Sequence, residues 1–442
     1  MVGARDGAPT GADRARFGIS RRALGEALLV GLGCVVVLAW RAPIATRQFW
    51  AEDGRVFFQD ALDKGPISPF ADAYGGYFHF VPRAIGALAS IGPLRYAATT
   101  TWALVALGVG VCAATVFLMS VPWLTSVAAR LTMAAGLVLL PSMNDESIAN
   151  AANLQFLLLF TALVVLIGVG RGRGMRIWAC TLLVVTGLTT PLAAALAPLA
   201  LWRVVRQRPR RVDAEVASWA GGVAAQLLAI VATRPDRGAG NVLTARQIVR
   251  GYATRVLYLN VSPTDHASRV GPVVVAVILV AVIGAATLVA FRRGDRSKSF
   301  LLVAVPATGV ILYVFAGVRL GLAEDLPPRY ELVPAWTLVW AALVATETLA
   351  AMLVGAGRLR PRTSATLVVA VCVALTVSWS FHWSVDPYRS AGPTWGASLS
   401  DSTQRCRDDP SASGASTVAV AIMPTGGDPP DWSVHIRCDA LR

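Results

Sequence analysis

Residues 272–291 read PVVVAVILVAVIGAATLVAF, a run of twenty residues without a charged side chain. A helix of that length spans about 30 Å, which is the thickness of the hydrocarbon core of a bilayer. Two further long runs are also predominantly apolar: Leu24–Trp40, whose one charged residue is Glu26, and Ala97–Ser120, which has none. Because lipid offers the backbone no hydrogen bonds, such runs cross a membrane as helices and not as barrel strands. The sequence therefore predicts an all-α integral membrane protein with about eleven membrane helices, two of them half-length.

The composition agrees with this class. Of the 442 residues, 55% are hydrophobic and only 15% are charged, whereas soluble proteins carry about 25% charged residues. The net charge is +14, and Lys64 and Lys298 are the only lysines. The arginines lie in short segments between the apolar runs, which is the distribution of the positive-inside rule. The positive charge is therefore interpreted as the signal that orients the protein in the lipid membrane. It gives little support for nucleic-acid binding.

The arginine clusters predict a multi-pass protein of the bacterial cytoplasmic membrane, with its N-terminus inside and its C-terminus outside. Residues 1–22 form a basic cytoplasmic N-terminus. Residues 23–383 form the membrane domain, with a first outer loop at 41–95. Residues 384–442 form a small external appendage.

One stretch, 177–202, is open to two interpretations because basic clusters flank both of its ends. A single crossing would place one of these clusters outside. Thr190-Pro191 interrupts the stretch, and proline ends a helix. We favour two half-length helices that enter from the cytoplasm, turn at Pro191 and return, since protein can surround such a turn.

Six cysteines fall into two groups. Cys406 and Cys438 lie in the external appendage, where the compartment permits a disulfide, and we expect one. The alternative is a pair of free thiols. The others lie in apolar runs and are expected to be small packing residues: Cys34, Cys112, Cys180 and Cys372.

The first outer loop holds the acidic pair Glu52-Asp53 directly after the first span. An apolar stripe at helical spacing follows at 57–62 and predicts a helix in the plane of the membrane interface. Ile85–Ile91 predicts a second interfacial helix. Between them, aromatic side chains gather at 74–80, where Gly75-Gly76 permits a tight turn.

An outward-facing carboxylate at the lipid surface suits general-base catalysis. The base would take a proton from a hydroxyl group while a lipid phosphate departs. Gly54 follows Asp53 and lets the backbone turn, so Asp53 is the first candidate for the base and Glu52 the second. The simpler interpretation of the pair is a solvated acidic cap on a helix.

Other outer segments supply candidate substrate-binding residues. Arginine binds phosphate with two parallel hydrogen bonds, and the candidates on this face are Arg83, Arg255 and Arg329. The remaining candidates are Tyr77, His79, Asn144, Asp145, Glu146, Asn153, Gln155 and Tyr330. For residues 144–146 the alternative is a polar turn, for Arg329 an interfacial arginine, and for His79 an interfacial aromatic side chain.

The sequence contains no Walker, nucleophile-elbow or dinucleotide-binding motif. No spacing of His, Cys and Asp suggests zinc. A divalent cation is possible as a cofactor, and no other cofactor is indicated.

Four strings carry a resemblance to a known family: FWAEDGRVFFQDAL (49–62), YGGYFHFVPR (74–83), ESIANAANLQFLLL (146–159) and PPRYELVPA (327–335). With the acidic outer loop after span 1 and the paired short helices, they resemble the glycosyltransferase C superfamily, and more closely an uncharacterised bacterial group within it. The likeness covers residues 20–385 and implies a polyprenyl-phosphate sugar donor, an envelope glycan or lipid acceptor, and Asp53 or Glu52 as catalytic base. The short outer tail departs from several relatives, which carry a large carbohydrate-binding domain there.

Two other classes of function stay open. A transporter or flippase of an envelope lipid would bury charged residues within its spans, and Glu347 is the main candidate. A non-catalytic membrane subunit of envelope assembly would leave the outer carboxylates free to vary.

Overall fold

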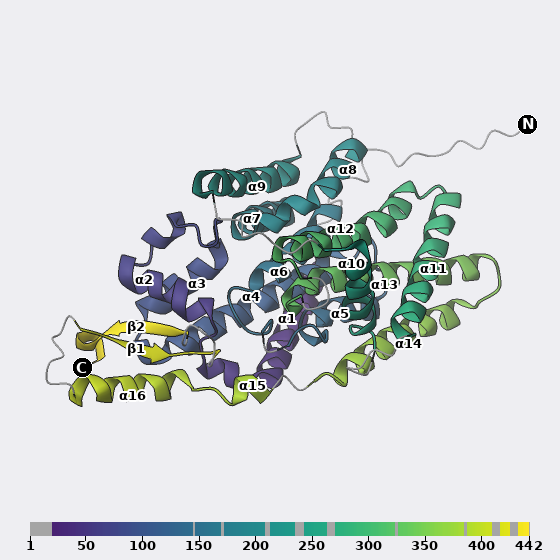
Figure 1. The fold of residues 1–442 in the computed structure, drawn as a ribbon. Helices are drawn as coiled ribbons and strands as arrows, with labels where there is room; N and C mark the ends of the chain where they lie inside the picture. Colours follow the sequence, from purple (N-terminus) through teal and green to yellow (C-terminus); the bar gives the residue numbers. More distant parts are fainter. Residues whose placement is uncertain are drawn as a thin grey trace, which may run out of the picture.

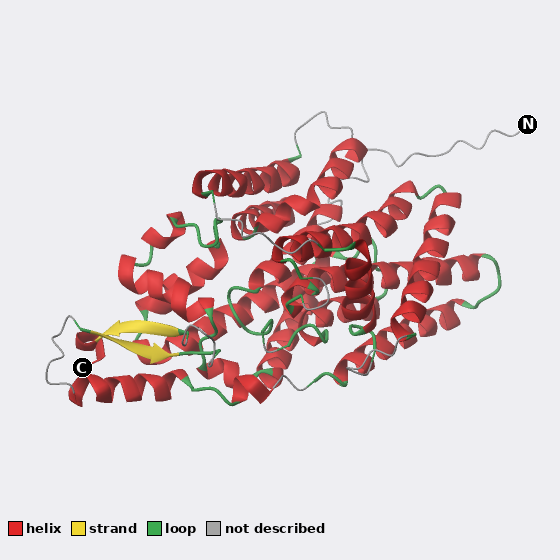
Figure 2. Cartoon of the chain, in the orientation of Figure 1, coloured by secondary structure: helices red, strands yellow, loops and turns green. Residues whose placement is uncertain are grey.

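The fold is mostly helical, with one short two-stranded sheet in the described part of the chain (Figure 2). This computed structural model describes residues 20–144, 146–168, 172–207, 213–234, 243–262, 270–322, 326–383, 387–408, 416–424 and 432–441. Of the basic N-terminus predicted at 1–22, residues 1–19 lie outside the described part of the chain. Ser20 caps the first helix.

Seven helices among the described residues are long and apolar enough to cross a membrane. They contain α1 (Arg21–Arg41), α4 (Ala97–Met119), α9 (Ala214–Thr233), α11 (Gly271–Arg292), α12 (Arg296–Leu320), α13 (Leu332–Gly355) and α14 (Pro361–Ser380). Four shorter helices complete the bundle: α5 (Val127–Leu139), α6 (Leu154–Ile167), α7 (Arg173–Thr189) and α8 (Ala197–Gln207). The structure therefore agrees with a multi-pass membrane protein, although four of the eleven helices are shorter than a full span.

The centre of the bundle is α6, which is buried along nearly its whole length. Phe160 of α6 packs against Trp336 of α13, with ring centroids 5.5 Å apart. At the edge of the bundle, α11 leaves most of its apolar surface uncovered. An apolar helix of this kind is stable where lipid covers it.

Glycines let pairs of helices approach closely, as is common between membrane helices. Gly187 of α7 lies against the backbone of Gly222 in α9, and these helices run side by side (Figure 1). Gly31 of α1 lies in the same way against Gly110 of α4. A Cβ atom at Gly31 or Gly187 would lie 2.6 or 2.7 Å from the backbone of the facing helix, so the helices would have to move apart.

The chain breaks at Thr190-Pro191, as predicted. After α7, a turn of 3-10 helix, η5 (Pro191–Leu196), leads into α8. Near the end of α8, Arg203 donates hydrogen bonds to the carbonyl oxygens of Leu166 and Gly168, at 3.0 and 2.6 Å. Both ends of the segment therefore lie at the end of α6, which is the geometry of a helical hairpin and not of one crossing. At 17 residues, α7 is longer than the half-length helix expected.

Arg203 also pairs with the carboxylates of Asp213 and Glu215, each at 2.7 Å. All three side chains are buried. Removing one partner of such a group would leave an uncompensated buried charge. Asp213 and Glu215 thus hold the hairpin to α9.

The first outer loop folds into a π-helical turn η2 (Asp53–Phe58), α2 (Gln59–Lys64) and α3 (Phe80–Ile91). Phe57, Phe58 and Ala61 are buried in protein. Phe58 lies edge-on to Trp395, with ring centroids 6.1 Å apart. The stripe therefore packs against α3 and the C-terminal appendage. The position of this helix in the plane of the membrane interface stays a prediction.

The C-terminal appendage begins after α15 (Pro387–Ser390) and contains α16 (Trp395–Asp408), β1 (Thr417–Ala421) and β2 (Ser433–Arg437). The strands are antiparallel, so the expectation of an all-α chain needs this correction. In Figure 1 the strands and α16 lie beside α2 and α3 at one end of the molecule. Phe49 and Phe58 of the outer loop share a hydrophobic cluster with appendage residues such as Val420 and Ile436.

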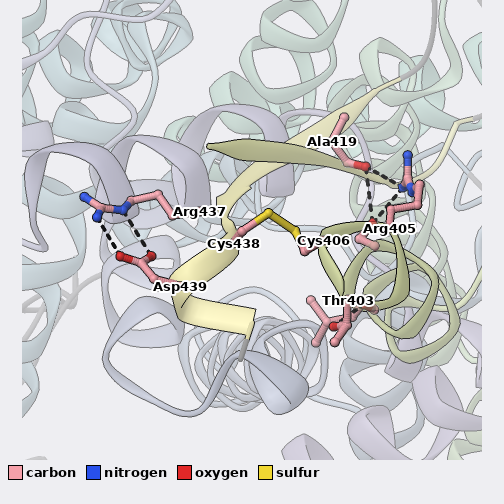
Figure 3. The surroundings of a disulfide bond; sticks show 9 residues. Thr403, Arg405, Cys406, Ala419, Arg437, Cys438 and Asp439 are labelled. Carbon is pink, nitrogen blue, oxygen red and sulfur yellow. Dashed lines mark hydrogen bonds and ion pairs between the residues drawn. A yellow bond between two sulfur atoms is a disulfide. The ribbon is translucent and has the colours of Figure 1, made fainter. Parts of the chain in front are cut away.

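A disulfide joins Cys406 of α16 to Cys438 at the end of β2, which confirms that expectation (Figure 3). The bond closes a loop with a sequence separation of 32 residues. In chain-entropy models, a loop of this size stabilises the folded state by about 3–4 kcal/mol. The other cysteines are free thiols, and three of the four are buried among apolar residues.

We expect labelling of single cysteines to report the predicted orientation. In a Cys180→Ser background, Ala71→Cys and Ala397→Cys should react with an impermeant maleimide in intact cells, because both positions are exposed in the outer segments. Arg358→Cys, also exposed, should react only after permeabilisation. The remaining free cysteines are buried and should give little background. The reverse pattern would invert the topology.

Candidate functional site

Three polar segments that are distant in sequence meet at one end of the bundle. Arg329, in the turn η7 (Pro328–Tyr330), pairs with Glu146. The side chain of Gln155 hydrogen-bonds with Tyr77 of the first outer loop. Asp53 accepts hydrogen bonds from the turn that precedes α6. These contacts join the first outer loop to the turn before α6, and that turn to Arg329. Whether Glu52 and Asp53 share one cavity with residues 144–146 and 329–330 stays a prediction.

Asp53 is buried, with only 3% of its surface exposed. One carboxylate oxygen accepts from the amide of Ala151 at 2.7 Å, and the other from the amide of Ala152 at 3.0 Å. Burial raises the pKa of Asp53 to about 7, while the two amide hydrogen bonds oppose this shift. Both oxygens are thus engaged, and the carboxylate fixes the outer loop to the start of α6.

The backbone on both sides of this contact is strained. Ala51 has φ of 40° and Ala149 has φ of 55°, in the left-handed region that non-glycine residues rarely adopt. Such conformations cost about 1–3 kcal/mol and persist where the surroundings hold them. The turn expected at Gly54 is made at Ala51 instead. At Gly54, a Cβ atom would lie 2.6 Å from the end of the Ile422 side chain of the appendage, so that side chain would have to move.

Glu52 differs from its neighbour Asp53 in its surroundings. Its side chain is half-buried, and it has no hydrogen-bond or ion-pair partner among the residues that the structure describes. Burial is the main cause that raises the pKa of Tyr74; the charge of Glu52 adds to it, and those of Arg55 and Arg329 oppose it. Glu52 therefore lies with two arginines around the Tyr74 hydroxyl group and is the accessible carboxylate of the pair.

Tyr77 and His79 form a stacked pair, with ring centroids 4.1 Å apart. Gly75 and Gly76, with φ of 60° and 88°, close the turn that brings Tyr74 and Tyr77 together. His79 is buried, and its Nδ1 donates to the carbonyl oxygen of Tyr77 at 3.3 Å. Burial lowers the pKa of His79 to about 4, so the ring is neutral at pH 7. This supports the aromatic interpretation of His79 over a role as a charged ligand.

Each of the three predicted arginines has a carboxylate partner. Arg83 is buried and pairs with Asp60 at 2.9 Å. Arg255 pairs with Glu331, and Arg329 with Glu146. A phosphate ligand would have to join or displace these carboxylates. Because the Arg329 side chain is about a third exposed, whereas that of Arg83 is not, Arg329 is the better placed to do so.

The turn before α6 is built by asparagines. The Nδ2 groups of Asn150 and Asn153 both donate to the carbonyl oxygen of Glu146, each at 2.6 Å. Asn153 thus has a structural role in this turn. Asp145 lies outside the described residues. Tyr330 packs edge-on against Phe156, with ring centroids 5.5 Å apart.

Asn144 and Arg255 line a small polar pocket of about 200 Å³, together with Ser142, Glu331 and His382. The Ser142 hydroxyl group lies 3.2 Å from the Glu331 carboxylate. The pocket adjoins the π-helical segment η6 (Tyr252–Tyr258), which follows α10 (Ala245–Gly251) and contains Arg255. The polar pocket therefore joins three predicted outer segments.

An apolar groove of about 590 Å³ lies on another face of η6. It runs between α11 and α12 and is lined by Tyr252, Leu257, Leu279, Ile283, Leu302 and Val303, among others. The segment η6 thus contributes to a polar pocket and to an apolar groove, which is the pairing that an amphipathic ligand would need.

Sequence reasoning missed several of these residues. Glu331 stands within the string at 327–335 but was not singled out, although a carboxylate so near Arg329 could have been. Arg389, which contacts Trp50 and Ile148, follows a span in a polar tail that gave no signal. Glu347, expected as the buried charge of a transporter, instead accepts hydrogen bonds from Thr125 and Ser126 at the start of α5.

No group of three or more His, Cys, Asp or Glu side chains within the described ranges is arranged to hold a metal ion. Comparison with known proteins adds no family assignment. No protein-family model matches the chain, and no curated protein matches it.

Proposed function

We propose that the protein is a membrane glycosyltransferase that moves a sugar from a polyprenyl-phosphate carrier to a cell-envelope glycan or lipid on the outer face of the bacterial cytoplasmic membrane. The observation that carries the proposal is the half-buried carboxylate of Glu52, which has no partner among the described residues and whose charge, like that of Arg329, acts on the Tyr74 hydroxyl group. A carboxylate beside a cation at the end of a membrane bundle suits proton removal next to a phosphate leaving group.

Within this proposal Glu52, and not Asp53, is the first candidate for the general base. A base must come within hydrogen-bonding distance of the proton that it removes. Both oxygens of Asp53 already accept backbone amides, and the side chain is buried. Glu52 is accessible and uncommitted among the described residues, so Asp53 takes the role of anchoring it.

In the proposed step, an acceptor hydroxyl oxygen attacks the anomeric carbon of the donor sugar. Glu52 takes the hydroxyl proton, and the bond between the anomeric carbon and the phosphate oxygen breaks. Its electron pair leaves with the polyprenyl phosphate, so the products are the glycoside, the carrier phosphate and protonated Glu52. Arg329 would stabilise the charge that develops on the phosphate.

The apolar groove supports a lipid-linked donor. It lies between α11 and α12, and α11 leaves most of its apolar side chains uncovered. The polar pocket at Arg255 lies on another face of η6 and reaches Glu331, two residues from Arg329 on the same turn. A prenyl chain in the groove would therefore lead its phosphate toward the arginines of the outer end.

The test is transfer by membranes that contain the protein. Membranes given radiolabelled polyprenyl-phosphate sugars should move label from the carrier to an envelope acceptor, and membranes with Glu52→Gln should not. A folded wild-type protein that transfers label from none of the bacterial carrier sugars would overturn the proposal and favour a non-catalytic subunit. Movement of intact carrier across the membrane without transfer would favour a transporter, although Glu347 serves as a helix cap and gives that alternative no support.

A further inference from the structure

Arg389 connects the C-terminal appendage with the site. It lies in α15, between the last span and the appendage, and only 1% of its surface is exposed. Its guanidinium group lies 4.8 Å from the ring centre of Trp50. Its Nη1 donates to the carbonyl oxygen of Ile148 at 2.7 Å. One side chain thus contacts the segment that leads to Glu52 and the turn that holds Asp53.

The backbone around Arg389 is also fixed to the outer loop. Nε2 of Gln48 lies within 3.0 to 3.2 Å of the carbonyl oxygens of Arg389, Gly392 and Pro393. Further along the appendage, the amide of Met423 donates to the carbonyl oxygen of Phe49 at 3.2 Å. The amide of Ala51 donates back to Met423. The appendage therefore holds residues 48–51 on both sides, directly before Glu52.

The charge of Arg389 acts on Asp53. Asp53 is a buried carboxylate within the electrostatic range of Arg389. Burial raises the pKa of Asp53 and the charge of Glu52 adds to the shift, whereas the charge of Arg389 and the amides of Ala151 and Ala152 lower it. Arg389 therefore favours the ionised form of Asp53, which can accept both amides.

We propose that Arg389 is a positioning residue for Glu52, and that through it the C-terminal appendage forms part of the candidate site. It stacks on Trp50 and holds the turn at Ile148, so that Glu52 stays at the outer face. The catalytic part of this inference rests on the proposed function, whereas the positioning part does not.

The test compares Arg389→Met and Arg389→Lys with Arg437→Met. Arg437 is an exposed arginine of the appendage that pairs with Asp439, and it serves as the matched control (Figure 3). In Arg389→Met, hydrogen exchange of the peptides that cover 48–58 and 148–153 should become at least tenfold faster, with no change in the helices of the bundle. Arg437→Met should exchange as the wild type does. Wild-type exchange in Arg389→Met would overturn the positioning role, whether or not transfer is ever detected.

The activity readout is a pH profile. Arg389→Met should lower sugar transfer at pH 7 by about 10²-fold, the cost of misplacing a reacting group by about 1 Å. The acidic limb of its profile should move to higher pH, because Asp53 loses a cation that favours its ionised form. Arg389→Lys keeps the charge, so its limb should stay near that of the wild type even if the rate falls. If Arg389→Met unfolds, Arg389→Lys is measured in its place. A shift of the acidic limb of the pH profile in Arg389→Lys would contradict the proposal, and so would hydrogen exchange equal to that of the wild type.

Discussion

Replacement of Glu52 by glutamine is expected to lower the rate of sugar transfer by about 10²–10⁴, the usual loss when a general base is removed. Glutamine keeps the size of the side chain but has no basic carboxylate. Because Glu52 has no hydrogen-bond partner among the described residues, the change should leave folding and membrane insertion intact. The measurement is transfer of labelled sugar by purified protein, with thermal unfolding followed on the same sample.

Asp63→Asn is the matched control for this experiment. Asp63 is an exposed carboxylate of the same outer loop, and among the described residues it accepts only from Gln59 of its own helix, at 3.0 Å. Its replacement should leave transfer unchanged. Normal transfer by Glu52→Gln would remove Glu52 from the role of base. If Asp53→Asn were inactive at the same time with wild-type stability, the order expected from the sequence would be restored.

The membrane architecture could be predicted from the sequence because its causes are local. A backbone in lipid must satisfy its own hydrogen bonds, so an apolar run such as 272–291 has one stable form, and the structure makes it α11. The break at Pro191 is also local, since proline removes a donor and clashes with the preceding turn. The return of the chain to the end of α6 depends on Arg203, yet the basic clusters at both ends of the segment already favoured it.

The surroundings of the first outer loop could not be predicted in the same way. A helical period shows that one face is apolar, but not whether lipid or protein covers that face. For Phe57 and Phe58 the cover is α3 and the appendage, and Trp395 comes from the far end of the chain. Such contacts depend on tertiary packing, which a pattern within one segment does not encode.

The candidate site also has features that could be predicted from the sequence and features that could not. The positions of the acidic pair and of Arg329 followed from the topology, and the charges of Glu52 and Arg329 both act on the hydroxyl group of Tyr74. Which of Glu52 and Asp53 is the better candidate for the base could not be predicted, because it depends on which of the two side chains turns inward. The glycine after Asp53 suggested a turn at that place, but the left-handed residue is Ala51, and Gly54 makes room for Ile422.

Replacement of Asp53 is expected to weaken the structure and not only the chemistry. Asparagine has one acceptor oxygen, and its amide nitrogen would face one of the two backbone amides that Asp53 now binds, at Ala151 or Ala152. A buried donor left without an acceptor costs about 1–3 kcal/mol, and Asp53→Ala would leave two. We therefore expect both variants to unfold at lower temperature than the wild type, with the larger loss in Asp53→Ala, and to lose transfer.

The pH dependence of stability separates this anchoring role from a purely catalytic one. The pKa of Asp53 is raised in the folded protein from 3.8 to about 7, mainly by burial. The folded state then binds more protons than the unfolded state between these values, so this group's contribution makes the wild type less stable as pH rises from about 4 to about 7. Asparagine does not titrate. When unfolding is measured from pH 4 to pH 8 in detergent, the stability of Asp53→Asn should therefore fall less with rising pH than that of the wild type. A catalytic carboxylate open to solvent would give Asp53→Asn the stability and pH profile of the wild type, and that result would return Asp53 to the role of base.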